Sequence, residues 1–93
     1  MRFYTRTEIQ QLLQIDDGLW VALEREEVVS GDAPAPECYS ERILERARVA
    51  RNLVEELDVN LAGAAIIVRM REEMAALRHD LERILGELGQ RGR

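Results

Sequence analysis

The sequence contains few of the residues from which catalytic and metal sites are built. Among 93 residues there is one cysteine, one histidine and no lysine, so every basic residue is an arginine. Cys38 has no second cysteine for an internal disulfide and no ligand at metal-binding spacing, which favours a role in packing. His79 falls outside the apolar stripe of its helix and should be solvated. Because there is also no catalytic triad pattern and no phosphate-binding glycine loop, we expect no enzyme activity, metal or cofactor.

Long apolar runs are missing as well. No segment approaches the roughly 20 residues that span a membrane, and the start MRFYTRTEIQ lacks the apolar core of a signal peptide. We therefore expect a cytoplasmic protein without a membrane partner. A chain of 93 residues forms only a modest core unless association with another chain buries more surface.

Acidic residues are concentrated in the N-terminal part of the chain. Residues 1–40 hold three arginines against eight Asp and Glu, whereas residues 41–93 hold ten of each. The whole net charge of −5 therefore resides in the first 40 residues. Such a surface repels the phosphates of nucleic acids and suits a basic partner.

Capping signals predict two short helices near the N-terminus. Thr5 and Glu8 have the spacing of a capping box, in which each side chain satisfies a backbone donor of the other residue. Asp16 is the N-cap candidate of a second helix, which should fade near Glu26. Two short helices joined by a few residues form a helix-turn-helix.

A β-hairpin wing and a third helix are expected next. Residues 28–29 are a short β-prone pair, and the run 30–36 cannot be helical because it contains two prolines and a glycine. Residues 37–39 can return as the second strand of a small hairpin. Ser40 then caps a third helix that should run to about Leu57.

An apolar stripe organises the last third of the chain. Asn60 is the N-cap candidate of a long helix that should stop at Gly89, and residues 61–68 are apolar almost all round, so they should lie in the chain's own core. From Ile67 onward, apolar residues recur at alternating spacings of three and four, which is typical of a coiled-coil seam. We predict a homodimer interface formed by Met70, Met74, Leu77, Leu81, Ile84 and Leu88.

The charges beside this stripe bear on how the two helices of a dimer are oriented. With Ile67 at heptad position a, Glu73 falls at a g position and Arg71 and Arg78 fall at e positions. A parallel pair sets Glu73 against Arg78 of the partner, whereas an antiparallel pair opposes like charges. The charges alone therefore favour a parallel pair.

The predicted fold is mainly α. It comprises a winged helix-turn-helix domain over residues 1–58, with a small β-hairpin wing, and a long C-terminal coiled-coil helix with a short tail over residues 59–93. This order is similar to that of MerR-type winged-helix proteins, and the similarity is carried by residues 4–9, 28–29 and 39–40. The MerR resemblance implies antiparallel helices in a dimer.

The likeness sharpens at residues 53–64, followed by 70–85, which resemble the CbpM-type chaperone modulators. The resemblance implies a non-catalytic regulator that binds and inhibits the J-domain of a DnaJ- or CbpA-like co-chaperone of Hsp70. MerR-type heat-shock repressors share the motif Asn60-Leu61-Ala62-Gly63, so a transcriptional regulator that binds DNA is the alternative. A third possibility is a structural protein whose coiled coil joins a larger assembly.

The second helix favours the J-domain over DNA. A helix that reads DNA carries Arg, Lys, Asn or Gln at its exposed N-terminal positions, whereas this helix begins with Asp16, Asp17 and Gly18. The resemblance implies a J-domain with a basic helix, and an acidic surface complements such a helix. We therefore expect no DNA binding, and we predict partner contacts at Asp16, Asp17, Glu24 and Glu27.

Overall fold

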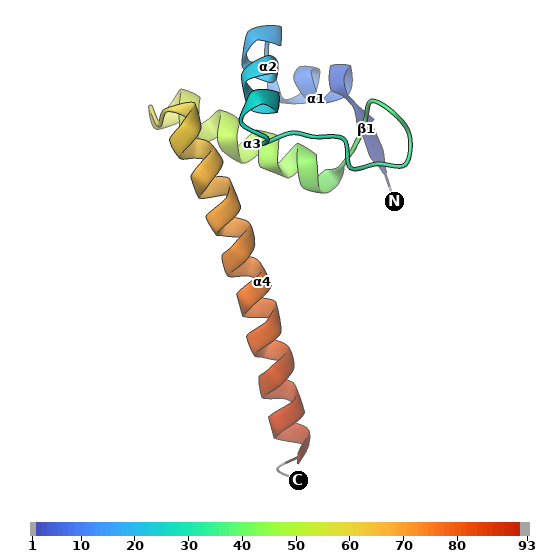
Figure 1. Cartoon of the computed structure of the whole chain (residues 1–93), viewed down its shortest axis with the longest axis vertical. Coiled ribbons are helices and arrows are strands. Elements are labelled where there is room, and N and C mark those ends of the chain that lie inside the picture. The colour runs from blue at the N-terminus through green and yellow to red at the C-terminus, as the bar shows by residue number, and fades with distance from the viewer. Residues whose placement is uncertain (1, 92–93) are drawn as a thin grey trace.

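The computed structural model describes residues 2–91, which form four helices and a two-stranded antiparallel sheet. The elements follow in the order β1 (Phe3–Thr5), α1 (Arg6–Leu13), α2 (Asp17–Arg25), β2 (Cys38–Ser40), α3 (Glu41–Glu56) and α4 (Leu61–Arg91). The first five elements gather at one end of the molecule, and α4 projects from them as a long rod (Figure 1). A mainly helical fold with a small antiparallel sheet is thereby confirmed.

The predicted capping residues set the starts of three helices. Thr5 Oγ1 accepts a hydrogen bond from the Glu8 N–H at 3.2 Å, and the Glu8 carboxylate accepts one from the Thr5 N–H at 3.0 Å, so the capping box of α1 is confirmed. Asp16 and Asn60 each accept the N–H of the residue three positions later at 2.7 Å, and these bonds start α2 and α4. These starts follow from contacts within three residues along the chain.

The predicted stop of the long helix is wrong. The helix α4 continues through Gly89 to Arg91, while the last two residues of the expected tail, 92–93, lie outside the described residues. A glycine ends a helix when it adopts a left-handed conformation, and no glycine among residues 2–91 has a positive φ. Although α4 has 31 residues, no described helix combines the length and apolar character required to cross a membrane.

The predicted wing hairpin is also wrong. The strand β2 pairs with the N-terminal strand β1, with Tyr39 opposite Tyr4, and not with residues 28–29. Val28 and Val29 are instead both buried, and their N–H groups bond to the Leu23 carbonyl at the end of α2, at 2.9 and 3.5 Å. Successive side chains of a strand point to opposite faces, so two adjacent valines that both enter the core do not form one.

Asp32 anchors the loop that occupies the place of the expected wing. Its carboxylate accepts a hydrogen bond from the Ser40 N–H at 2.9 Å and another from the Ser40 hydroxyl. Ser40 is the N-cap residue of α3, as predicted, but its side chain makes no capping bond because it is engaged with Asp32. The loop between α2 and β2 is thereby tied to the start of α3.

We expect Asp32 to stabilise the fold in a pH-dependent way. Partial burial raises the pKa of Asp32, but hydrogen bonds from Ser40 and the charge of Arg42 outweigh this effect, so the net pKa is lowered. A lowered carboxyl pKa stabilises the folded state above the unfolded value of about 3.9, and this contribution is lost as pH falls through the folded value. Asp32→Ala should lower the free energy of unfolding at pH 7 by about 0.5–1 kcal/mol, since the site is exposed to solvent.

Urea unfolding at a series of pH values measures this contribution. The difference between the wild type and Asp32→Ala should shrink as the pH falls from about 5 to about 2. Glu26→Ala is the control, because it removes a carboxylate that forms no hydrogen bond or ion pair within residues 2–91. A difference for Asp32→Ala that stayed constant over this range would contradict the assignment.

The core is centred on Trp20. Its indole is fully buried and packs edge-on against the Tyr39 ring, with ring centroids 5.4 Å apart. From α4, only the first two turns reach the core, where Ala64, Ala65 and Val68 are buried. The segment 61–68 therefore enters the core on one side only.

The expectation that the whole segment 61–68 is buried is wrong for Ala62, Ile66 and Ile67, which are all exposed. Ile66 is 51% exposed and Ile67 is 39% exposed. A helix turns about 100° per residue, so these two side chains lie away from the face that Val68 turns towards α3. The apolar surface at the start of α4 is thus only partly used within the chain.

Candidate functional site

An exposed apolar stripe covers one side of α4. The predicted interface residues lie on it, and their side chains are between 46% and 67% exposed: Met70, Met74, Leu77, Leu81, Ile84 and Leu88. From residue 73 to residue 91 every position of α4 is exposed. Leu85, which falls outside the strict seam pattern, is 57% exposed and widens the stripe. No other described element of this chain covers it.

Most of the stripe points away from the rest of the molecule, and Met74 at its edge also lines a hollow between α3 and α4. Val68 is buried against α3, and Leu77 follows nine residues later, which is about two and a half turns and therefore the opposite side of the helix. The stripe extends about 32 Å from Ile67 to Leu88 at about 1.5 Å per residue. A partner helix can therefore cover it without displacing α3.

The predicted partner-binding acids are all exposed, but two of them also make contacts within the chain. Asp16 caps α2, as described above. The Asp17 carboxylate accepts hydrogen bonds from Gln10 Nε2 at 2.8 Å and from Arg6 Nη2 at 3.3 Å. The bond from Gln10 is the main reason that the pKa of Asp17 is lowered, and the Arg6 charge adds to it. Asp17 thus connects α2 to α1, whereas Asp16 bonds within α2 only, and a role of either residue in partner binding remains a prediction.

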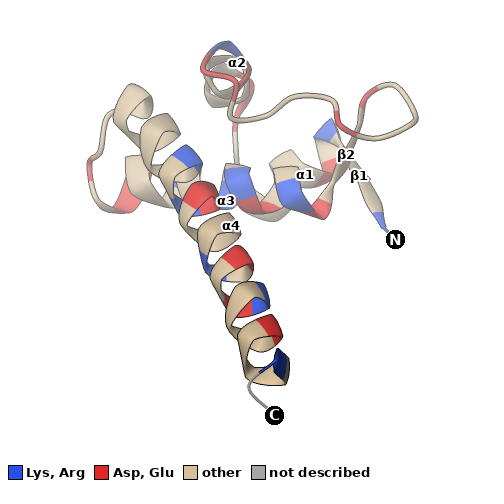
Figure 2. Cartoon of the chain, turned by 60° about the horizontal axis from the view of Figure 1, so that its bottom comes forward, with Lys and Arg blue, Asp and Glu red and all other residues tan. Residues whose placement is uncertain are grey.

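Glu24 and Glu27 are differently placed. Within residues 2–91 neither carboxylate accepts a hydrogen bond or forms an ion pair. Glu24 lies seven residues after Asp17 on the same side of α2, about 10 Å along the helix axis. Figure 2 shows further acidic residues on α2 and the loop that follows it, whereas both signs of charge alternate along α4. The carboxylates of Glu24 and Glu27 are therefore free to meet a basic partner.

Glu24 borders a hollow that we did not predict from the sequence. The hollow has a volume of about 460 Å³ and is lined by Thr5, Arg6, Thr7, Trp20, Glu24, Pro36, Glu37, Cys38 and Tyr39. Burial raises the pKa of Tyr39, and the carboxylates of Glu24 and Glu37 raise it further. The charge of Arg6 lowers this pKa but does not outweigh the other effects. Folding therefore brings together two acids that are 13 positions apart in the sequence. We name this region, with Glu24, Glu37 and Tyr39, the acidic hollow.

Aromatic rings form part of the wall of the acidic hollow. The buried Trp20 Nε1 has no hydrogen-bond partner among residues 2–91. The Arg6 guanidinium lies 5.7 Å from the centre of the Trp20 ring and is held by Gln10 and Asp17 at 3.2 and 3.3 Å. Because Trp20 is fully buried, Tyr39 is the ring that a ligand can reach, and an aromatic ring beside carboxylates suits a cationic side chain, whose stem packs on the ring while its charge meets the acid. The acidic hollow can thus accept an Arg or Lys side chain from another protein.

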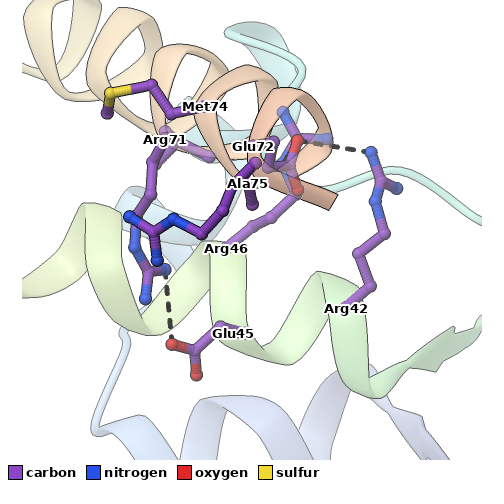
Figure 3. Close-up of a pocket in the computed structure, with 9 residues that line it drawn as sticks. Arg42, Glu45, Arg46, Arg71, Glu72, Met74 and Ala75 are labelled. Carbon is purple, nitrogen blue, oxygen red and sulfur yellow. Dashed lines mark hydrogen bonds and ion pairs between the residues drawn. The ribbon is translucent and has the colours of Figure 1, made fainter. Parts of the chain in front are cut away.

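A second hollow lies between α3 and α4 (Figure 3). This groove has a volume of about 410 Å³ and is lined by Arg42, Glu45, Arg46, Val68, Arg71, Glu72, Met74, Ala75 and Arg78. Arg71 donates to Glu45 at 3.4 Å, and Arg42 donates to Glu72 at 3.4 Å, as the dashed lines in Figure 3 show. These contacts connect residues of α3 and α4 that are up to 30 positions apart in the sequence. We call this region the α3–α4 groove.

Comparisons of the chain with protein-family models, with curated proteins and with solved structures find no match. Three surfaces of the chain are available for interaction: the apolar stripe, the acidic hollow with α2, and the α3–α4 groove.

Proposed function

We propose that this chain is a non-catalytic cytoplasmic regulator that binds and inhibits the J-domain of a DnaJ- or CbpA-like co-chaperone of Hsp70. The proposal follows the resemblance to CbpM-type modulators. The observation that carries it is that Glu24 and Glu37 line the same hollow beside Tyr39. A basic helix can place an Arg or Lys side chain in this acidic hollow while Glu27 meets a second cation. A J-domain helix covered in this way is no longer free for Hsp70.

The proposal includes the architecture of the N-terminal part. We propose that residues 1–58 are a MerR-like helix-turn-helix domain whose wing is reduced to the loop between α2 and β2. Asp32 holds this loop against the start of α3. Pro36 and Glu37, at the end of the same loop, line the acidic hollow. In this proposal the segment that serves as a wing elsewhere contributes to a protein-binding surface here.

We also propose that the chain acts as a homodimer through the apolar stripe of α4. Residues 73–91 form 19 consecutive exposed positions, whereas most of the stability of helices in proteins comes from packing of an apolar face against a partner. A second copy offers an identical stripe of the same length and spacing, which is the requirement for knobs-into-holes packing. Covering the stripe also removes a large apolar patch from solvent.

Charge reversal in the acidic hollow tests the J-domain proposal. Glu24→Arg combined with Glu37→Arg should slow association with a J-domain at least about tenfold at low salt, because opposite charges steer the encounter of the two proteins. The effect should shrink as salt is added, since the screening length is about 8 Å at physiological ionic strength. Association rates from biolayer interferometry at several salt concentrations measure this effect.

The matched control is Glu55→Arg combined with Glu82→Arg, which changes the net charge equally at exposed positions outside the acidic hollow. The control should associate within about twofold of the wild-type rate. Asp16 is left unchanged because it caps α2, and loss of a cap costs about 1 kcal/mol of stability. If both double variants associated as fast as the wild type, the proposed surface would be wrong.

The alternative, a MerR-type transcriptional regulator, requires DNA binding. The exposed start of α2 presents Asp16, Asp17 and Gly18, and residues 28–29 form no hairpin wing that could reach a groove or a phosphate. Because attraction to phosphates supplies most non-specific DNA affinity, we predict no binding to duplex DNA at physiological salt. A mobility-shift titration measures this, and sub-micromolar, salt-sensitive binding would support the transcriptional regulator instead.

A further inference from the structure

The α3–α4 groove differs in charge from the rest of this acidic chain. Four arginines and two glutamates are among its lining residues, which leaves a local excess of two positive charges in a protein of net charge −5. Both helices contribute: Arg42 and Arg46 come from α3, and Arg71 and Arg78 come from α4. The cations therefore converge through folding and do not form a run along the sequence.

Two of these arginines have donors that the chain itself does not use fully. The Arg46 side chain is only 11% exposed, and its buried Nε lies 3.6 Å from Glu72 Oε1, which is an ion-pair contact but too long for a hydrogen bond. Arg78 forms no ion pair with any residue in the range 2–91. A guanidinium offers five N–H donors, and an unsatisfied buried donor favours binding of an acceptor.

The remaining lining is apolar. Val68 is 2% exposed at the base of the groove, and Met74 and Ala75 continue this surface along α4. The volume of about 410 Å³ lies within the range of about 300–1,000 Å³ that is typical of pockets for small molecules. A ligand that combines an anionic group with a short apolar body matches both parts of the groove.

We propose that the α3–α4 groove binds a small organic anion with a phosphate or carboxylate group joined to an apolar body. The anionic group meets Arg46 and Arg78, and the apolar body lies over Val68 and Ala75. Glu45 and Glu72 neutralise part of the arginine charge, so the groove takes one anionic group and not a polyanion. All lining residues come from one chain, and the site does not depend on the J-domain. Met74 also belongs to the apolar stripe of the proposed dimer, so the apolar body of the ligand rests on Val68 and Ala75 and not on Met74.

Isothermal titration of the full chain with phenyl phosphate, inorganic phosphate and benzoate tests the proposal. Phenyl phosphate should bind about tenfold more tightly than inorganic phosphate, because burial of an apolar group is favourable. Tighter binding of phenyl phosphate than of benzoate identifies a phosphate ligand, and the reverse order identifies a carboxylate ligand. Equal affinity for inorganic and phenyl phosphate would overturn the proposal, since the apolar lining would then play no part.

Three variants test whether binding occurs in the groove. Arg78→Gln should weaken phenyl phosphate binding at least about tenfold, because it removes a charged hydrogen-bond donor. Glu45→Gln should tighten binding several-fold by releasing Arg71 from its ion pair. Arg69→Gln makes the same charge change at an exposed α4 position that does not line the groove and should bind within about twofold of the wild type. Equal weakening by Arg78→Gln and Arg69→Gln would mean non-specific attraction and overturn the site.

Discussion

Replacing Leu77 and Leu81 with aspartate should convert the proposed homodimer into monomers. In a symmetric dimer each substitution counts twice, so the double variant removes four leucines that the proposed interface buries. Burial of one leucine contributes about 1.5–3 kcal/mol, so the loss is at least about 6 kcal/mol, and the dissociation constant should rise about 10⁴-fold or more. Sedimentation velocity over a range of concentrations from about 1 to 100 µM measures this change.

The control places the same two carboxylates on another side of α4. Ala76 and His79 are exposed and lie outside the apolar stripe, so Ala76→Asp combined with His79→Asp should leave the dimer intact. The Leu77 and Leu81 variant should also lose circular dichroism signal for residues 73–91, because an unpartnered helix frays. A wild-type chain found monomeric by light scattering at tens of micromolar would contradict the dimer itself.

The elements of this fold that could be predicted depend on local signals. The side chains that start α1, α2 and α4 bond to groups three positions away, so Thr5, Asp16 and Asn60 were recognisable from sequence alone. The alternation of three and four that defines the stripe is equally local, because it reflects the period of one helix.

The errors arise where distant contacts override local preference. Val28 and Val29 have the β-branched side chains that favour strands, yet both side chains are buried in the hydrophobic core and form no strand. The actual partner of β2 is β1, and Tyr4 and Tyr39 are 35 positions apart in the sequence. Gly89 permits a helix stop but does not require one, and α4 continues through it.

The interaction surfaces, too, could be predicted only where their residues are close together in the sequence. Glu24 was predicted as a contact residue because it belongs to an acidic cluster in the sequence. Glu37 was not, because only the fold of the loop before β2 brings it to the acidic hollow. The α3–α4 groove was also missed, since Arg42 and Arg71 belong to helices that meet only in the folded chain. A charge cluster along the sequence therefore identifies only those residues of a site that are neighbours in the sequence.

We expect the two α4 helices of the dimer to run antiparallel. In a parallel pair Glu73 meets Arg78 of the partner chain, and this contact favours the parallel orientation. Arg71, the other e-position arginine, is already paired with Glu45 of its own chain at 3.4 Å. In an antiparallel pair centred on the midpoint of the stripe, e positions face each other, so the two Arg78 side chains meet and Arg71 lies near the partner's Leu85. Among the e positions this leaves one like-charge contact, and exposed charge pairs contribute only about 0.2–1 kcal/mol each.

A distance measurement between spin labels separates the two orientations. Gln90→Cys in a Cys38→Ser background places one label per chain on α4, on the side away from the stripe. If the stripes from Ile67 to Leu88 pair about their midpoints, antiparallel helices separate the two labels by about 40 Å, at about 1.5 Å per residue. Parallel helices, with axes about 10 Å apart, would bring the labels to about 20 Å. Pulsed electron paramagnetic resonance resolves these distances, and a single peak near 20 Å would show that the helices run parallel.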